Sequence, residues 1–122
     1  MAFQPGALSG TAFLTIDGLE FPVVSGVGYQ VSRVTRETLT GQSGVHGFSE
    51  KPVAPYIKAT IRDIAEISIA GFEAMTDVSV SLELASGKRI SGNGMWNVGA
   101  VEVNSDEATY DLRFDGLDVQ ET

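Results

Sequence analysis

Residues 108–115 read Ala-Thr-Tyr-Asp-Leu-Arg-Phe-Asp, and this stretch decides the fold class. Apolar side chains occupy every second position, namely Ala108, Tyr110, Leu112 and Phe114. Successive side chains of a β-strand point to opposite faces of a sheet, so this pattern is typical of a strand with one buried face. We therefore predict a strand here that packs its apolar face into a core.

Other stretches of the chain show the same strand pattern. They are residues 11–16, 27–31, 57–61 and 78–84, and we expect a further strand at 98–103. The run that starts at Val27 continues with a polar face as far as Thr40. Asp17-Gly18 and Ser86-Gly87 separate such runs and favour hairpin turns. Pro22 has no N–H to donate, so the strand around it is predicted at a sheet edge. The chain is therefore predicted to be mainly β.

Two short segments interrupt the strand pattern. Ile69, Phe72 and Met75 recur at helical spacing, and Ser68 before them is a favoured N-cap residue, so we expect the only helix there. Gly26-Val27-Gly28 lacks the following helix of a dinucleotide-binding fingerprint. It indicates instead a bulge or a close approach of two backbones.

Composition and charge narrow the function classes. The chain has 122 residues, no cysteine, eight Lys plus Arg and sixteen Asp plus Glu, which gives a formal charge of −8 at pH 7. We expect one domain covering residues 1–122, with no disulfide to support it. A charge of −8 disfavours tight binding to phosphate backbones.

Residues 1–10 contain no Lys or Arg, so we interpret them as a flexible arm rather than a secretory signal. No stretch of the sequence resembles a bilayer span, so we expect no membrane partner.

The segment from Gly41 to Tyr56 has three glycines, Pro52 and Pro55, and no regular apolar period. We predict a loop of about 15 residues, a length at which loops of compact domains are usually functional or mobile. We expect this loop to be an interaction surface.

Candidate catalytic and metal-binding residues are few. His46 is the only histidine, and zinc sites commonly use three or four protein ligands, so we expect it to be a hydrogen-bonding or packing residue of the loop. Acid pairs such as Asp63 with Glu66, or Asp111 with Asp115, are expected by chance among sixteen carboxylates. We therefore predict no enzyme activity, no metal and no cofactor.

The same mid-chain segment carries a family resemblance. Arg36-Glu37, Gly44-Val45-His46-Gly47-Phe48, Glu50-x-Pro52-x-Ala54-Pro55-Tyr56-Ile57 and Ile61-x-Asp63 resemble the tail tube proteins of Mu-like contractile-tailed phages and prophages. The resemblance extends through the Asp17-Gly18 hairpin, residues 80–88, the neighbourhood of Trp96 and the closing acidic strand. It implies a β-sandwich or barrel-like tail tube fold with one short peripheral helix. It also implies six copies closed into a ring, with rings stacked into a tube that conducts double-stranded DNA.

The resemblance also implies site residues and partners. Residues 41–56 become an assembly loop whose contacts to another subunit or ring are Gly44, Val45, His46, Gly47, Phe48, Pro52, Pro55 and Tyr56. Candidate acids of the tube lumen are Glu83, Asp111 and Asp115, and their placement on the outer surface stays open as the alternative. The implied partners are identical copies, the tail sheath, the tape measure protein, the baseplate and terminator proteins, and transiently DNA. The implied location is the virion tail, with assembly in the host cytoplasm.

Two alternatives stay open at this point. The first is the inner tube of a related contractile device, such as an R-type bacteriocin or a type VI secretion system, which need not carry DNA. The second is a small β-sandwich binding module, for example for carbohydrate. That module would show a cluster of exposed aromatic residues, which the sequence lacks.

Overall fold

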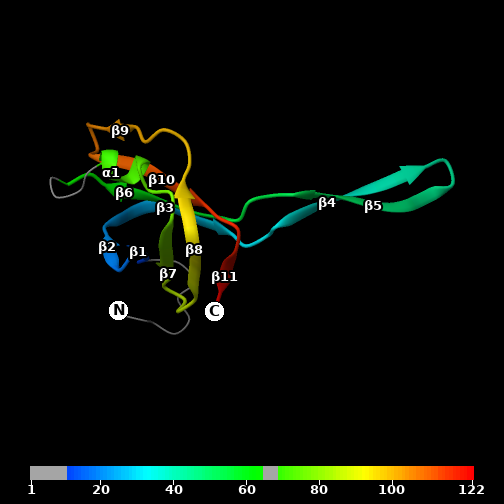
Figure 1. Ribbon diagram of the computed structural model, residues 1–122, viewed down its shortest axis with the longest axis horizontal. Helices are drawn as coiled ribbons and strands as arrows, with labels where there is room; N and C mark the ends of the chain where they lie inside the picture. Colours follow the sequence, from blue (N-terminus) through cyan, green and yellow to red (C-terminus); the bar gives the residue numbers. More distant parts are fainter. Residues whose placement is uncertain (1–10, 65–68) are drawn as a thin grey trace.

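The structure is a computed structural model that describes residues 11–64 and 69–122. In these two ranges the elements follow the chain in this order: β1 (Phe13–Ile16), β2 (Leu19–Phe21), β3 (Val23–Gln30), β4 (Val34–Gly41), β5 (Gly44–Pro52), β6 (Tyr56–Arg62), α1 (Ile69–Glu73), β7 (Val78–Glu83), β8 (Arg89–Asn97), β9 (Val103–Asn104), β10 (Thr109–Asp115) and β11 (Val119–Glu121). Figure 1 shows a body at one end and the β4–β5 hairpin extending away from it. The mainly β prediction is confirmed.

The body consists of two layers of antiparallel strands. One layer has the order β2-β1-β7-β8-β11, and the other contains β10, β6 and β3, with β9 paired to β10. The layers join where Asn97 at the end of β8 pairs with Phe114 of β10. β2 and β3 at the two ends of this path are not paired with each other, so the body is an open sandwich and not a closed barrel.

The core lies between these layers and follows from the alternation in the sequence. Every second residue of β10 and β6 is buried, and the same holds for most of β7. The buried apolar residues form one cluster: Leu14, Ile16, Ile57, Ala59, Ile61, Phe72, Val78, Val80, Leu82, Ile90, Met95, Tyr110, Leu112, Phe114 and Val119. Because both layers contribute to one core, their outward-facing side chains lie on opposite sides of the body.

The predicted turns and the predicted edge strand are confirmed. Asp17 and Gly18 have φ values of 49° and 85°, which is the left-handed pair that a two-residue hairpin turn requires, and Ile16 pairs with Leu19 across it. β7 and β8 form the second predicted hairpin, with Glu83 opposite Arg89. β2 is the terminal strand of its layer and ends immediately before Pro22.

Gly26 and Gly28 mark a close approach, as the sequence predicts. The pairing of β3 with β6 shifts register between Ser25 and Gly28. A Cβ atom on Gly26 would lie 2.7 Å from Oγ1 of Thr60, and one on Gly28 would lie 2.8 Å from Cε of Lys58. Larger residues would therefore push the edge strand away from β6.

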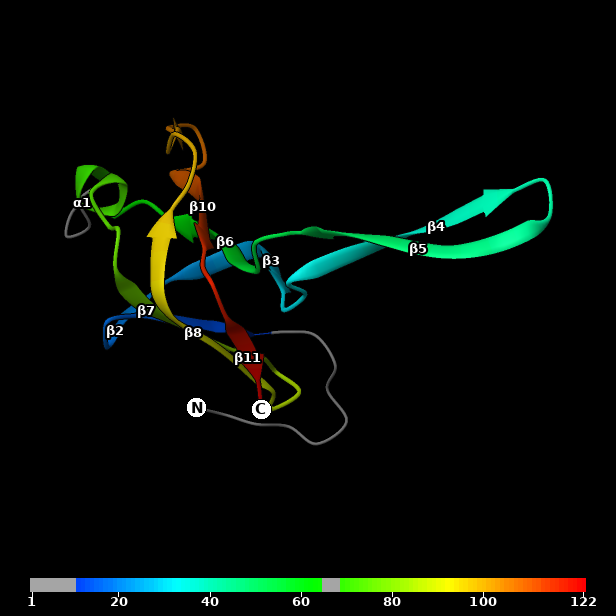
Figure 2. The same ribbon diagram turned by 45° about the vertical axis from the view of Figure 1, so that its right-hand side comes forward.

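The predicted helix is present but shorter than expected. α1 ends at Glu73, before Met75, while Ser68 and its capping role lie outside the described residues. Phe72 is buried and packs edge-to-face on Phe21, with ring centroids 5.2 Å apart. This contact fixes the helix at the periphery of the sandwich (Figure 2).

Two expectations about strands are wrong. The long strand predicted from Val27 to Thr40 is broken at residues 31–33, where the chain leaves the body. The strand predicted at 98–103 is reduced to β9, because residues 98–102 are irregular. β8, in contrast, continues through Gly92 and Gly94 by a shift of register opposite β7. The predicted arm at residues 1–10 lies outside the described residues.

Candidate assembly surfaces

The segment expected to be a loop forms most of a hairpin. β4 and β5 pair from Val34 opposite Pro52 to Gly41 opposite Gly44, with a register shift after Leu39. Figures 1 and 2 both show this hairpin extending from the body with nothing packed along it. The prediction of irregular structure for residues 41–56 is wrong. A strand is recognised in a sequence by the alternation of apolar and polar residues that one buried face produces. None of the residues of β4 or β5 is buried, so the alternation is absent.

Side chains paired across an antiparallel hairpin share one face. One face therefore carries Val34 with Pro52, Thr38 with Phe48, and Thr40 with Val45. We call this set the apolar face. Val45 is 74% exposed and Phe48 is 58% exposed. Arg36 and Glu50 lie on the same face as an ion pair at 3.5 Å, and the Arg36 guanidinium lies 5.7 Å from the Phe48 ring centroid.

The opposite face of the hairpin is mostly polar. It carries Thr35, Glu37, Leu39, Ser49 and Lys51. The His46 side chain also lies on this face, because its ring occupies the space that a Cβ atom on Gly41 would fill. Its Nε2 atom lies 2.8 Å from Oγ of Ser43, so the expectation of a hydrogen-bonding loop histidine is confirmed. The hairpin is therefore amphipathic, with neither face covered within the described chain.

The predicted contact residues separate into three places. Gly44 to Phe48 lie on the distal part of the hairpin, and Pro52 lies at its root. Pro55 is buried in the body, where its carbonyl accepts a hydrogen bond from the Gly116 N–H at 3.0 Å. Tyr56 begins β6, with the Arg113 guanidinium 4.2 Å from its ring centroid. The structure thus leaves the distal residues and Pro52 exposed, and it uses Pro55 and Tyr56 within the body.

Each of the three candidate lumen acids has a local partner. Glu83 lies 3.2 Å from Nη2 of Arg89, and Asp115 lies 2.9 Å from Nε of Arg113. Asp111 accepts a hydrogen bond from the Thr60 hydroxyl at 2.6 Å.

These acids do not share one surface. Asp111 and Asp115 lie on the outer side of the β10–β6 layer, whereas Glu83 lies on the outer side of the β7–β8 layer. Lys58 and Arg113 pair with each other across β6 and β10 and place positive charge among the acids of the first surface. A single bore can therefore be lined by only one of these two groups.

A groove at the root of the hairpin is a surface that the sequence reasoning missed. It encloses about 350 Å³ and is lined by Arg33, Pro52, Val53, Ala54, Trp96, Gly116 and Leu117. Trp96 lies in this lining and is only partly buried. Leu117 is 77% exposed and stands alone between Gly116 and Asp118 in the sequence. The feature of the sequence that could have indicated this surface is Leu117, an isolated leucine in an acidic turn.

The interior holds one perturbed titratable group. Burial raises the pKa of Tyr110 to about 12, with a smaller contribution from the charge of Asp63. The Tyr110 hydroxyl has no hydrogen-bond partner within the described ranges. Residues 11–64 and 69–122 contain no group of three His, Asp or Glu side chains placed to hold a metal ion. In the same ranges, no helix has the length and apolar character needed to cross a membrane.

A family model described as phage tail tube protein matches residues 6–121 of this chain. The chain belongs to the phage tail tube protein family. It is also similar to the Mu-like prophage FluMu tail tube protein of Haemophilus influenzae, with 29% identity over 97 residues that cover 80% of this chain and 81% of that protein. The resemblance found in the sequence is confirmed. A tail tube protein is a structural component of the virion tail and not a class of enzyme.

Proposed function

We propose that this tail tube protein assembles with identical copies into closed rings of six, which stack into a tube that conducts double-stranded DNA. The hairpin supplies the contact between rings. Family membership supports a place in the tail, and the number six and the conduit follow the family resemblance.

The observation that carries this proposal is the uncovered hairpin. An isolated two-stranded hairpin is at best marginally stable in water, and independent stability needs further strands or a packed face. Here eight residue pairs extend from the body while Val45 and Phe48 remain exposed. Another polypeptide that covers the apolar face would provide the missing packing, and a second copy is always available at the concentrations of assembly.

The edges of the sandwich support closure into a ring. Among residues 11–64 and 69–122, β3 pairs with β6 on one side only, which leaves an eight-residue strand with an open edge, and β2 has an open edge at the other end of the path. Exposed strand edges are templates for pairing with another chain, and closure of a ring removes them. We therefore assign lateral contacts to the body and axial contacts to the hairpin.

Passage of DNA is supported by the net charge rather than by the three candidate acids. Six copies at −8 each give −48 per ring, and like charge discourages phosphates from adhering to the wall. Asp115 on one face and Glu83 on the other contribute less negative charge because each lies beside an arginine, whereas the hydroxyl partner of Asp111 carries no opposite charge. The tape measure protein, the sheath, and the baseplate and terminator proteins remain the proposed further partners, with assembly in the host cytoplasm.

The test is removal of residues 45–48. This deletion removes the distal part of β5, and Ser49 to Pro52 remain to pair with Val34 to Glu37. We expect the purified variant to stay folded by circular dichroism and to form no tubes in negative-stain electron microscopy, while the intact chain forms them. Thr35→Asp on the polar face is the matched control and should still form tubes. Normal tubes from the deletion variant would refute the role of the hairpin.

A further inference from the structure

The hairpin and the body differ in net charge. The hairpin, residues 34–52, contains Arg36 and Lys51 against Glu37 and Glu50, which gives a net charge of zero. The remaining residues contain six basic and fourteen acidic side chains, which gives −8, and one of these basic residues, Arg33, lines the root groove. Two bodies of this charge repel each other at close range, whereas the hairpin of one copy meets no such repulsion from the body of another.

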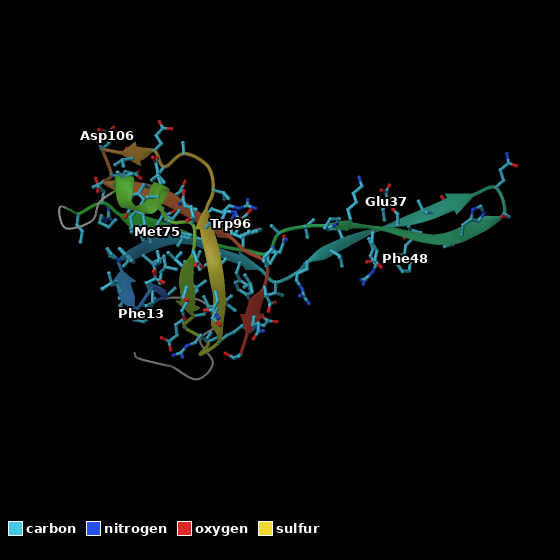
Figure 3. All side chains as sticks on the ribbon, in the orientation of Figure 1. Phe13, Glu37, Phe48, Met75, Trp96 and Asp106 are labelled. Atoms are coloured by element: carbon cyan, nitrogen blue, oxygen red, sulfur yellow. The ribbon has the colours of Figure 1, made fainter. Side chains whose placement is uncertain are left out.

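The hairpin and the root groove are also complementary in polarity. The exposed side chains of the distal hairpin include Val45 and Phe48, and the groove contains Trp96, Val53 and the exposed Leu117. Figure 3 shows Phe48 near the middle of the hairpin, away from the body that carries Trp96, so the two do not meet within one chain. Asp118 follows Leu117 directly and adds negative charge beside the groove.

We infer that the distal apolar face of one copy, centred on Val45 and Phe48, docks in the root groove of the next copy, against Trp96 and Leu117. This inference rests on the proposed function and specifies the surface that receives the hairpin. Burial of Phe48 against Trp96 and Leu117 removes the largest exposed apolar side chains of both surfaces from water. Arg36, which lies on the same hairpin face, approaches Asp118 beside the groove.

The contact has a direction, because donor and acceptor are different surfaces. Each copy carries one hairpin tip and one groove, so the tip of each copy occupies its neighbour's groove and leaves its own groove free for another. Contacts of this kind continue without closing and produce a filament. The root position of the groove means that every docked tip lies beside the point where the next hairpin begins.

Cysteine cross-linking tests the contact directly, because the chain contains no cysteine of its own. Disulfides form only when the Cβ atoms approach to about 4 Å. We expect F48C mixed with L117C to yield a disulfide-linked dimer on oxidation, and the double variant to yield a ladder of higher multimers. V45C replaces F48C if the aromatic ring proves necessary for assembly. L19C, an equally exposed leucine on β2, is the control and should give no dimer with F48C.

A complementation experiment separates this inference from the proposed function. F48D retains an intact groove, and L117D retains an intact hairpin. Each variant alone should form no tubes. Their mixture should form paired complexes that sedimentation detects and that grow no further. Normal tubes from L117D, together with no cross-link to position 117, would overturn the groove and leave the hairpin role intact. Normal tubes from F48D would overturn both.

Discussion

The pairing of β6 with β10 and the pairing of β4 with β5 are similar as backbone structures. Seven residue pairs join the first two strands and eight join the second two. They differ in what covers them. In the first pair, the inward side chains of both strands enter the common core, and Phe114 is 1% exposed. In the second pair, Phe48 is 58% exposed and no residue of either strand is buried.

This difference shows that backbone hydrogen bonds alone do not indicate whether a pair of strands has its apolar face buried or exposed. The free energy of folding comes largely from apolar area removed from water, and only the body removes it within one chain. The hairpin extends the same kind of strand pairing into solvent. In the proposed assembly, its apolar face gains that stabilisation from another copy.

The largest effect on stability is expected in the buried pair of strands, β6 and β10. Phe114→Ala removes a buried ring from the core and should lower the free energy of unfolding by about 3 to 5 kcal/mol, which is usual for such truncations. Urea denaturation of the unassembled protein at pH 7 measures this loss. A change below about 1 kcal/mol would mean that the layers do not pack around Phe114 as described.

A second effect depends on pH and is again confined to the body. The pKa of Tyr110 is raised to about 12 in the folded state, whereas an unfolded tyrosine titrates near pH 10. The contribution of the neutral phenol is therefore fully present below about pH 10 and is lost as the pH rises toward 12, because the unfolded chain releases its proton first. The loss should reach at most about 3 kcal/mol.

Tyr110→Phe isolates this contribution. Because the hydroxyl has no hydrogen-bond partner within the described ranges, the variant should match the parent at pH 7 and exceed it in stability above pH 10. Denaturation curves at pH 7 and pH 11 measure the difference, and Tyr29 and Tyr56 remain as an internal reference in both proteins. Identical pH dependence of the two proteins would contradict the burial of this phenol.

Most strands of the body could be predicted from the sequence because a strand with one buried face alternates apolar and polar residues. Alternation at Tyr110, Leu112 and Phe114 predicts a half-buried strand, and Asp17-Gly18 predicts the turn that the structure has. The strand predicted at 98–103 failed because apolar composition without alternation does not fix a partner strand, and only β9 pairs there.

The candidate site was harder to predict for the same reason. Gly44 to Phe48 were predicted to be a contact region, but the strand that carries them was missed because no face of β5 is buried. Leu117 and Trp96 come together with Val53 only through the fold, since they lie far apart in sequence. Periodicity within a single stretch of sequence carries no information about such a groove.

The smallest effect on stability belongs to the hairpin. Phe48→Ala makes the same chemical change as Phe114→Ala, and it should alter the free energy of unfolding of the unassembled protein by no more than about 0.5 kcal/mol, because exposed side chains contribute little. Urea denaturation at protein concentrations too low for assembly gives this value, and electron microscopy of the same samples after concentration gives the effect on tubes. We expect a stable protein that does not polymerise. A loss of several kcal/mol from Phe48→Ala would mean that the hairpin packs on its own body, and the contrast between the two regions would then disappear.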